Sequence, residues 1–188
     1  GRTWSAAEVL SQLNLQPIAP GAKEGLSLVN GTPCMTGLAC LALDDAERLM
    51  NWADVTGAMS FEALRGQLVA FDAEILALKA SPGIQTSGQR LRELLADSPL
   101  LAESQGLRTQ DALSLRSMPQ VHGACRDQFS HAQTQINIEL NACTDNPLIL
   151  GTVEQWRVVS QAHPHGESVA MACDLLAIAM AEIGRASC

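Results

Sequence analysis

The sequence predicts an all-α protein, a bundle of long helices with one short β-hairpin near residues 148–160. Aromatic residues form 3% of the chain and tyrosine is absent, whereas β-rich domains usually draw on aromatic and β-branched side chains. Alanine and leucine, which favour helices, are abundant. Long segments also carry apolar residues at steps of three and four, which is the spacing of one helical face.

The composition predicts a single helical domain over residues 1–188. Of the 188 residues, 47% are hydrophobic and 17% are charged, so the chain holds enough apolar surface to offset the entropy of ordering it. The net charge of −8 opposes binding to phosphate backbones and argues against a nucleic-acid partner. The six cysteines are scattered and the N-terminus shows no export signal, so we expect reduced thiols and a cytoplasmic location.

The first third of the chain predicts two helices. Ser5 and Glu8 form a capping box at the start of the first, which ends near Asn14. The second runs from Thr36 to about Ala58. Its predicted apolar face is imperfect and consists of Leu38, Leu41, Asp45, Leu49, Trp52 and Thr56.

The middle of the chain predicts a helix over 61–80, ended by Ser81-Pro82-Gly83, and a short helix over 89–97. The clearest helix follows from Pro119 to about residue 142, where Asp145-Asn146-Pro147 stops it. Its apolar face steps by three and four through Val121, Cys125, Phe129, Ala132, Ile136 and Leu140.

The C-terminal part predicts the hairpin over 148–160, centred on Gly151, and then a final helix over 166–185. This helix is apolar on nearly every side, so it should be buried all round. Asp174 and Glu182 interrupt it, which argues against a membrane span. Because 188 residues leave little material to surround such a helix, we expect a homo-oligomer through the 119–142 and 166–185 helices.

Five separated blocks carry the strongest signal for function. In chain order they are Lys23-Glu24-Gly25-Leu26-Ser27-Leu28-Val29-Asn30-Gly31-Thr32, Gln110-Asp111-Ala112-Leu113-Ser114-Leu115-Arg116, Met118-Pro119-Gln120-Val121-His122-Gly123, Asn141-Ala142-Cys143-Thr144-Asp145-Asn146-Pro147-Leu148 and His165-Gly166-Glu167. In this order and spacing, they resemble the histidine and phenylalanine ammonia-lyases over nearly the whole chain.

The resemblance implies an all-helical tetramer that eliminates ammonia from an α-amino acid. That family uses a methylidene-imidazolone electrophile made from an internal Ala-Ser-Gly. The resemblance places Asn30 beside the electrophile and the substrate amine, Gln110 on the pocket wall, and Arg116 on the substrate carboxylate. A planar guanidinium binds a carboxylate through two parallel hydrogen bonds, which suits the last of these roles.

Several features depart from the family pattern. No Ala-Ser-Gly occurs, and because the family's tripeptide precedes the segment resembling residues 1–21, we expect the chain to begin after it. Thr86-Ser87-Gly88 looks like a variant of the tripeptide but falls in what we expect to be a variable loop. Leu113 stands where the family usually has a tyrosine, and Pro164 where an aromatic residue commonly flanks the pocket. The family's catalytic base is a tyrosine, and this chain has none.

Each candidate residue also has a simpler interpretation. Arg116 is an ordinary partner for Asp111, Asn30 a turn residue before Gly31, and Gln110 with Asp111 a helix cap. His163, His165 and Glu167 could suggest a metal, but two histidines at this spacing without a cysteine pair are typical of polar turns. We therefore predict no metal.

Two functional hypotheses remain at this point. In the first, the chain is the substrate-binding part of a lyase or a related aminomutase, with a possible amino acid ligand, and is active only when another segment or chain supplies the electrophile and base. In the second, it is a non-catalytic helical protein that keeps the family's core and assembly surface. For the chain in isolation, the missing groups favour the second.

Overall fold

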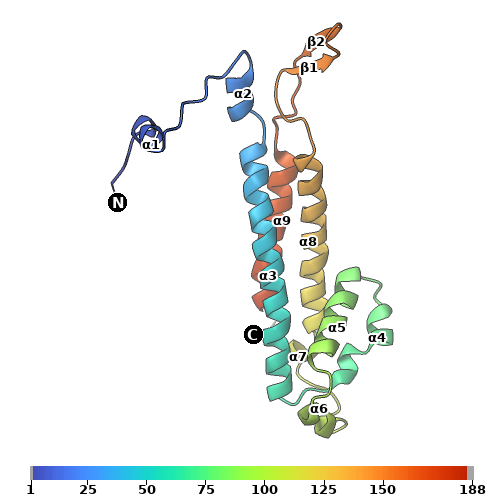
Figure 1. Cartoon of the computed structure of the whole chain (residues 1–188). Coiled ribbons are helices and arrows are strands. Elements are labelled where there is room, and N and C mark those ends of the chain that lie inside the picture. The colour runs from blue at the N-terminus through green and yellow to red at the C-terminus, as the bar shows by residue number, and fades with distance from the viewer. Residues whose placement is uncertain (1, 186–188) are drawn as a thin grey trace. The chain divides into compact units, whose positions relative to one another are not determined.

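The computed structural model describes residues 2–185 and confirms a helical protein with one small antiparallel sheet (Figure 1). Two compact units are formed by chain segments that alternate along the sequence. The first combines the residues up to Gly31 with Thr144–Pro164, and the second combines Thr32–Cys143 with the residues from His165 on. Each unit is described by itself. That residues 1–188 form a single domain stays a prediction.

The first unit holds the two N-terminal helices and the hairpin. Helix α1 (Ala6–Gln12) begins with the predicted capping box between Ser5 and Glu8, and α2 (Glu24–Val29) follows the proline-containing stretch. Strands β1 (Leu148–Gly151) and β2 (Trp156–Val159) pair antiparallel. The predicted hairpin is therefore confirmed within the range 148–160.

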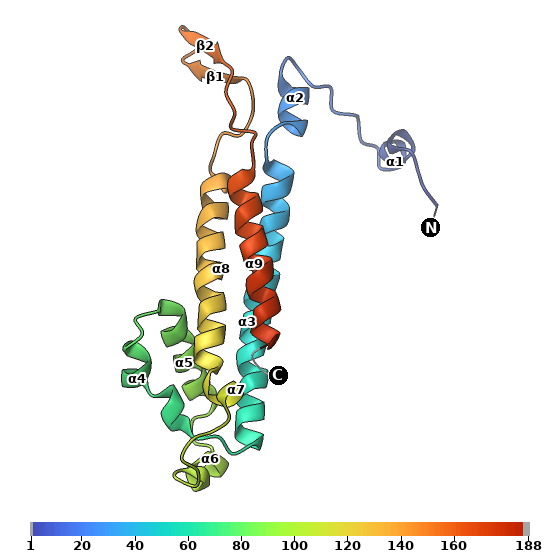
Figure 2. The same ribbon diagram turned by 180° about the vertical axis from the view of Figure 1, so that it is seen from behind.

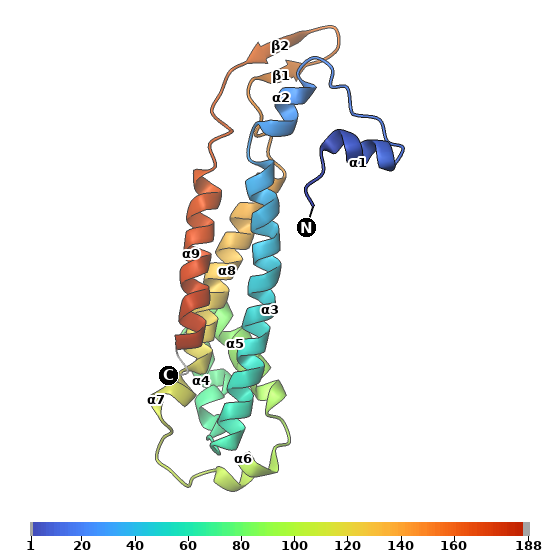
Figure 3. The same cartoon turned by 90° about the vertical axis from the view of Figure 1, so that its left-hand side faces the viewer.

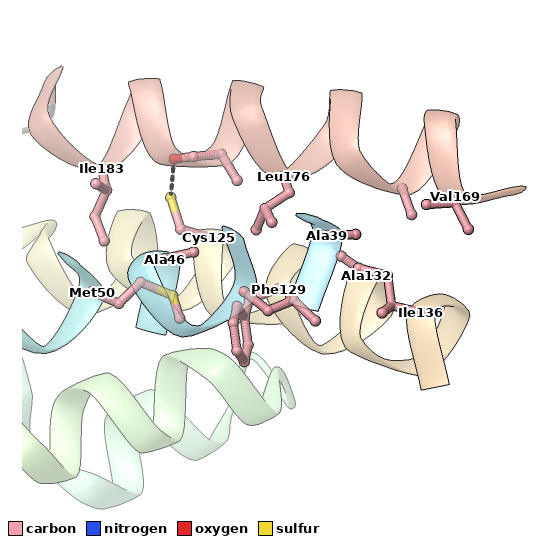
Figure 4. Packing of buried hydrophobic residues seen from close by; sticks show 13 residues of the cluster. Ala39, Ala46, Met50, Cys125, Phe129, Ala132, Ile136, Val169, Leu176 and Ile183 are labelled. Atoms are coloured by element: carbon pink, nitrogen blue, oxygen red, sulfur yellow. Dashed lines mark hydrogen bonds between the residues drawn. The ribbon is translucent and has the colours of Figure 1, made fainter. Parts of the chain in front are cut away.

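The second unit is a bundle of three long helices with shorter helices at one end. Helix α3 (Pro33–Ala63) runs in one direction, α8 (Met118–Leu140) returns, and α9 (Glu167–Arg185) runs parallel to α3 (Figures 1 and 2). The core between them contains several small side chains, which let the helices approach closely. Its members include Ala39, Ala46, Met50, Phe129, Ala132, Ile136, Ala172, Leu176 and Ile183 (Figure 4).

Helix α8 buries most of the predicted side, but Val121 is only partly buried and Leu140 is 58% exposed. Cys125, Phe129, Ala132 and Ile136 are all buried in the core. The Cys125 thiol donates to the Ala179 carbonyl of α9 at 3.0 Å, which joins the two helices by a polar contact inside an apolar core (Figure 4). Periodicity succeeded here because the apolar residues occupy a single face.

For α3, the predicted apolar face is wrong. Leu38, Leu41 and Trp52 are 66–69% exposed. The buried face is formed instead by Thr36, Ala39, Leu43, Ala46, Met50, Asp54, Ala58 and Phe61. Large apolar residues occur on both faces of α3, so residue type alone does not show which face meets the neighbouring helices.

Between α3 and α8, the predicted helix over 61–80 is also wrong. Helix α3 ends at Ala63, and a short 3₁₀ turn η1 (Leu68–Phe71) and α4 (Ala73–Ala77) follow. Arg65 and Ala80 adopt left-handed φ angles of 52° and 47°, which a continuous right-handed helix does not allow. Periodicity alone did not reveal these breaks.

The Ser81-Pro82-Gly83 string begins a helix rather than ending one. Ser81 accepts a hydrogen bond from the Ile84 amide and Pro82 occupies the first turn of α5 (Pro82–Leu94). The predicted short helix over 89–97 therefore corresponds to the last part of α5. Helices α6 (Pro99–Ser104) and α7 (Leu113–Arg116) then lead into α8 (Figure 3).

Helix α9 is not buried on every side within the chain. Val169, Ala172, Leu176, Ala179 and Ile183 are buried, whereas Met171, Leu175 and Ile178 are 39–61% exposed. The reason is that α3 and α8 both pack on one side of it. The exposed side agrees with the expectation that 188 residues cannot surround this helix, and its complete burial in a homo-oligomer stays a prediction.

Among the described residues, one helical stretch, Glu24–Ala63, could cross a membrane by its length and composition. In its most apolar segment of 18 residues, 17% is buried. Within it, α3 uses one face to pack against α8 and α9. The same face carries the fully buried Asp54, which pairs with two arginines. These features are typical of a core helix in a bundle.

Candidate functional site

Asn30 is held by a carboxylate far away in sequence. Its Nδ2 donates to Asp145 Oδ1 at 2.7 Å and to the Asn146 carbonyl at 2.9 Å. The other carboxylate oxygen of Asp145 accepts from Ser27 Oγ at 2.9 Å and forms an ion pair with Lys23. Asn30 is therefore more than a turn residue, because its side chain ties α2 to the loop before the hairpin.

The charge of Asp145 is stabilised by this cluster. The hydrogen bond from Lys23 is the largest cause, followed by that from Asn30, and together they hold the pKa of the Asp145 carboxyl far below its usual value. The Asn146 amide adds a hydrogen bond to Oδ1 at 2.7 Å. Asp145 is thus a permanently ionised acceptor at neutral pH.

Further contacts fix the loop that carries Asp145. The Asn146 side chain accepts from the Gln161 amide at 2.8 Å, and the Gln161 side chain donates to the Asp145 carbonyl at 2.5 Å. On the other side, Gly31 adopts φ +81°, and a Cβ there would lie 2.6 Å from Thr144 Oγ1 and 2.8 Å from the Thr144 carbonyl oxygen. Only glycine fits both the backbone angle and the space.

Gly31→Ala is therefore expected to open the Asn30 cluster. The left-handed angle alone costs about 1–2 kcal/mol for an L-residue, and the methyl group would also meet the Thr144 backbone. Amide hydrogen exchange should accelerate at 24–31 and 144–146, as measured by mass spectrometry. Gly106→Ala is the matched control, because Gly106 has φ +77° but nothing within 4 Å of a Cβ. Equal effects from the two variants would contradict the steric argument.

Gln110 and Arg116 both lie in the second unit, near α7. Gln110 is exposed in the loop before the helix, and Arg116 is its last residue. The helix-cap interpretation is not supported, because the N-cap of α7 is Ala112 and no side chain caps it. Asp111 instead accepts from the Gln67 amide at 2.6 Å.

Arg116 does not have the ordinary partner considered for it. Asp111 forms its ion pair with Arg108, at 2.9 Å. Within residues 2–185, Arg116 Nε is buried and has no hydrogen-bond partner, and the same holds for Gln120 Oε1. An unsatisfied buried donor costs about 1–3 kcal/mol, and more for a charged group. Arg116 Nε is thus an unsatisfied buried donor among the described residues.

The positions that depart from the family pattern offer no hydroxyl group. Leu113, the first residue of α7, is 66% exposed, and Pro164 is partly buried in the loop before α9.

A hollow of about 460 Å³ lies between the C-terminal half of α3 and α7. It is lined by Thr56, Gly57, Ser60, Leu64, Ala112, Ser114, Leu115 and Met118.

Thr86-Ser87-Gly88 does not fit the role of an electrophile precursor. The string lies inside α5, not in the variable loop that we expected, and its serine and glycine are buried. Ser87 Oγ accepts from Arg126 Nε at 3.1 Å, and a Cβ at Gly88 would lie 2.1 Å from Leu76 Cδ1. Backbone cyclisation would require this packed helical segment to open.

No group of three or more His, Cys, Asp or Glu side chains suited to a metal occurs among the residues that the structure describes. Asp145, Lys23 and Ser27 had no predicted role, although all three stand in the quoted blocks. Their pairing spans 118 residues or more, so only a family motif, and not local periodicity, could have suggested it.

The long helices α3, α8 and α9 define a helical-bundle protein, and in sequence Asn30 precedes α3 and Arg116 precedes α8. The family model for aromatic amino acid lyases matches residues 1–188. A histidine ammonia-lyase from Gloeobacter violaceus is 47% identical over 184 residues, which cover 97% of this chain and 35% of that protein. The chain belongs to the aromatic amino acid lyase family.

Solved structures agree with this assignment. Histidine ammonia-lyase from Trypanosoma cruzi is similar with a TM-score of 0.83 and 38% identity, over 96% of this chain and 33% of that one. Tyrosine aminomutase from Streptomyces globisporus gives a TM-score of 0.88 and 32% identity, over 99% of this chain and 39% of that one. The chain spans about a third of the length of the curated relatives it matches.

Proposed function

We propose that this chain supplies the amino-acid-binding residues of an ammonia-lyase or a related aminomutase. Arg116 binds the substrate carboxylate, Asn30 contacts the amine, and Gln110 lines the pocket. The observation that carries the proposal is the buried Arg116 Nε, which has no partner within residues 2–185. The curated relatives named as histidine ammonia-lyases favour a histidine-like substrate, and the aminomutase structures keep the isomerisation open as the reaction.

Arg116→Ala is expected to weaken amino acid binding by at least about tenfold, because a hydrogen bond to a charged group contributes about 1.5–3 kcal/mol. Binding of L-histidine and L-phenylalanine to the purified chain is measured by ligand-detected NMR. Arg48→Ala is the control, since Arg48 is exposed and pairs with Asp44 on the surface of α3. Unchanged affinity in Arg116→Ala, or no binding by the parent chain, would contradict the proposal.

We propose further that these 188 residues do not turn over an amino acid unaided. Elimination of ammonia needs an electron sink to activate the amine and a base to take the β-proton. The family derives the first from Ala-Ser-Gly and uses a tyrosine as the second, and the chain contains neither. The expected result is no ammonia release from L-histidine, L-phenylalanine or L-tyrosine in a coupled assay. Turnover by the purified chain alone would refute this part.

A second proposed property is self-association, through the 119–142 and 166–185 helices. On α9, Met171 and Ile178 are 59% and 61% exposed, and a hollow of about 330 Å³ between α3 and α9 is lined mainly by apolar side chains. Exposed apolar surface of this kind is typical of interfaces. Self-association fits the second hypothesis, an assembly role that needs no catalysis, and equally the tetrameric lyase that the family resemblance implies. Cytoplasmic location and the absence of nucleic-acid and membrane partners stay predictions.

Ile178→Lys is expected to shift the chain toward the monomer, because it places a charge in the apolar face of α9. Analytical ultracentrifugation gives the mass in solution. Leu13→Lys serves as the control, since Leu13 is 62% exposed outside α9. A parent chain that is monomeric at micromolar concentration would contradict the proposed self-association.

A further inference from the structure

The cluster around Asp145 determines which atom of Asn30 faces a ligand. The Asn30 Nδ2 group has two hydrogens, and both are used by acceptors, Asp145 Oδ1 at 2.7 Å and the Asn146 carbonyl at 2.9 Å. Neither acceptor can donate. If the amide were flipped, Oδ1 would face two oxygen atoms with no hydrogen between them, so the orientation is chemically fixed.

The remaining polar atom of the side chain is therefore Oδ1. Among residues 2–185, no hydrogen bond is donated to it. A carboxamide oxygen only accepts hydrogen bonds. It attracts an ammonium or amine N–H and repels a carboxylate oxygen.

We propose that Asp145 is a positioning residue, which orients Asn30 so that its carboxamide oxygen accepts a hydrogen bond from the amino group of the ligand. This inference rests on the proposed function, which supplies the amino acid as ligand. The position of Asn30 thus offers an acceptor, which suits an amine and not a carboxylate.

The contacts of Asp145 explain why a carboxylate is required at this position. Lys23 and Ser27 are both donors, and they occupy Oδ2, while Oδ1 receives Asn30 and the Asn146 amide. An asparagine at 145 would have to turn its amide hydrogens toward one of these two sets of donors. Four donors on one side chain are satisfied only by a group that accepts at both oxygens.

The first test observes the Asn30 side-chain amide by ¹⁵N NMR of the 188-residue chain without ligand. In the parent chain we expect its hydrogens to exchange with water at least about tenfold more slowly than those of Asn137, which is exposed. Asp145→Asn and Asp145→Ala should both bring the two rates within about twofold. Asn30→Ala identifies the signal. Equal rates in the parent chain, or continued protection in Asp145→Ala, would overturn the proposal.

The variant Lys23→Met distinguishes the positioning of Asn30 by Asp145 from a general role of Asp145 in holding the loop. This variant removes the ion pair but leaves Oδ1 free to accept from Asn30, so the Asn30 amide should stay protected. If only the integrity of the cluster mattered, Lys23→Met would remove protection as Asp145→Ala does. That result would overturn the assignment of Asp145 as a positioning residue.

Two probes test the polarity of Asn30. 2-Phenylethylamine carries an ammonium and no carboxylate, and 3-phenylpropionate the reverse. We expect the amine to shift the Asn30 ¹³Cγ signal and the acid to leave it unchanged. A shift with the acid, or none with the amine, would overturn the acceptor assignment.

The outcomes also separate this inference from the proposed function. Protection of Asn30 with no binding of L-phenylalanine at Arg116 would refute the proposed function and leave the positioning by Asp145 intact. Normal binding of L-phenylalanine with an unprotected Asn30 would refute the positioning by Asp145 and leave the proposed function intact.

The protection of Asn30 should also depend on pH. Because the pKa of Asp145 is lowered, its carboxylate contributes above the unfolded value of about 3.9. The protection should therefore persist from pH 7 to about 4 and be lost only at lower pH.

Discussion

Asp54→Ala is expected to lower the free energy of unfolding by about 3–5 kcal/mol, the usual cost of removing one partner from a buried ion pair. Asp54 is fully buried in α3 and accepts from His122 Nδ1 at 2.8 Å and from Arg90 Nε at 2.9 Å. Arg126 forms a third contact with the same carboxylate. Since the carboxylate only accepts, His122 Nδ1 must carry the hydrogen.

The cost arises mainly from the partners that remain buried. The side chain of Arg90 is 37% exposed and can turn toward water, whereas those of Arg126 and His122 are 13% and 2% exposed. Without Asp54, these two would lose a charged acceptor in a region that is largely shielded from water. The midpoint of urea denaturation, followed by circular dichroism, measures the effect.

Asp44→Ala provides the control on the same helix. Asp44 pairs with Arg48 on the surface, where both side chains are more than half exposed, and exposed pairs contribute roughly 0–1 kcal/mol. The prediction for Asp54 fails if the two alanine variants have the same midpoint.

The pH dependence of this effect follows from the Asp54 pKa. Burial alone would raise it, but the hydrogen bond from His122 and the charge of Arg126 outweigh burial, and the pKa is lowered. A carboxyl group with a lowered folded pKa stabilises the fold above its unfolded value, about 3.9, and loses that contribution as the pH falls through the folded value. The difference between the parent chain and Asp54→Ala should therefore be constant at neutral pH and shrink below about pH 4.

Gly123→Ala is the second substitution with a large expected effect, a loss of about 3 kcal/mol or more. Helices α5 and α8 cross with their backbones in contact, since a Cβ on Gly123 would lie 2.4 Å from the Ile84 amide nitrogen. From the opposite helix, a Cβ on Gly83 would lie 2.1 Å from the Gly123 carbonyl oxygen. Backbone atoms cannot rotate away as side chains can, so the helices must separate, which is costlier than the usual 1–3 kcal/mol of overpacking.

Gly37→Ala tests whether the steric contact is the cause. Gly37 lies in α3 with nothing within 4 Å of a Cβ, so alanine there should stabilise the chain by up to about 1 kcal/mol through helix propensity. We expect Gly123→Ala to lower the midpoint of urea denaturation and Gly37→Ala to raise it. Stabilisation by Gly123→Ala would show that α5 and α8 do not cross as closely as described.

The accuracy of the sequence-based predictions depends on whether the information is local. The capping box at Ser5 and Glu8, the hairpin over 148–160 and the helix from Pro119 all depend on residues near in sequence, and all three are confirmed. The helix over 61–80 fails because two residues take left-handed angles, and neither Arg65 nor Ala80 signals this by its type.

For the site, the sequence blocks identified Asn30, Gln110 and Arg116 through their family resemblance, and the family itself is confirmed. Their roles stay proposals. The sequence did not reveal that Asp111 pairs with Arg108, or that Asp145 holds Asn30. Arg108 and Arg116 are both near Asp111 in sequence, and the folded backbone alone decided which one reaches it.

By itself, the sequence determined the helical class, the first capping box, the hairpin and the family, because helix propensity, capping and motif order are properties of neighbouring residues. The tertiary structure alone decided which face of α3 is buried, where two glycines allow helices to touch, and which donors surround Asp54 and Asp145. The physical reason is that burial and ion pairing depend on atoms from distant segments, whose approach is governed by the shapes of the surfaces that meet.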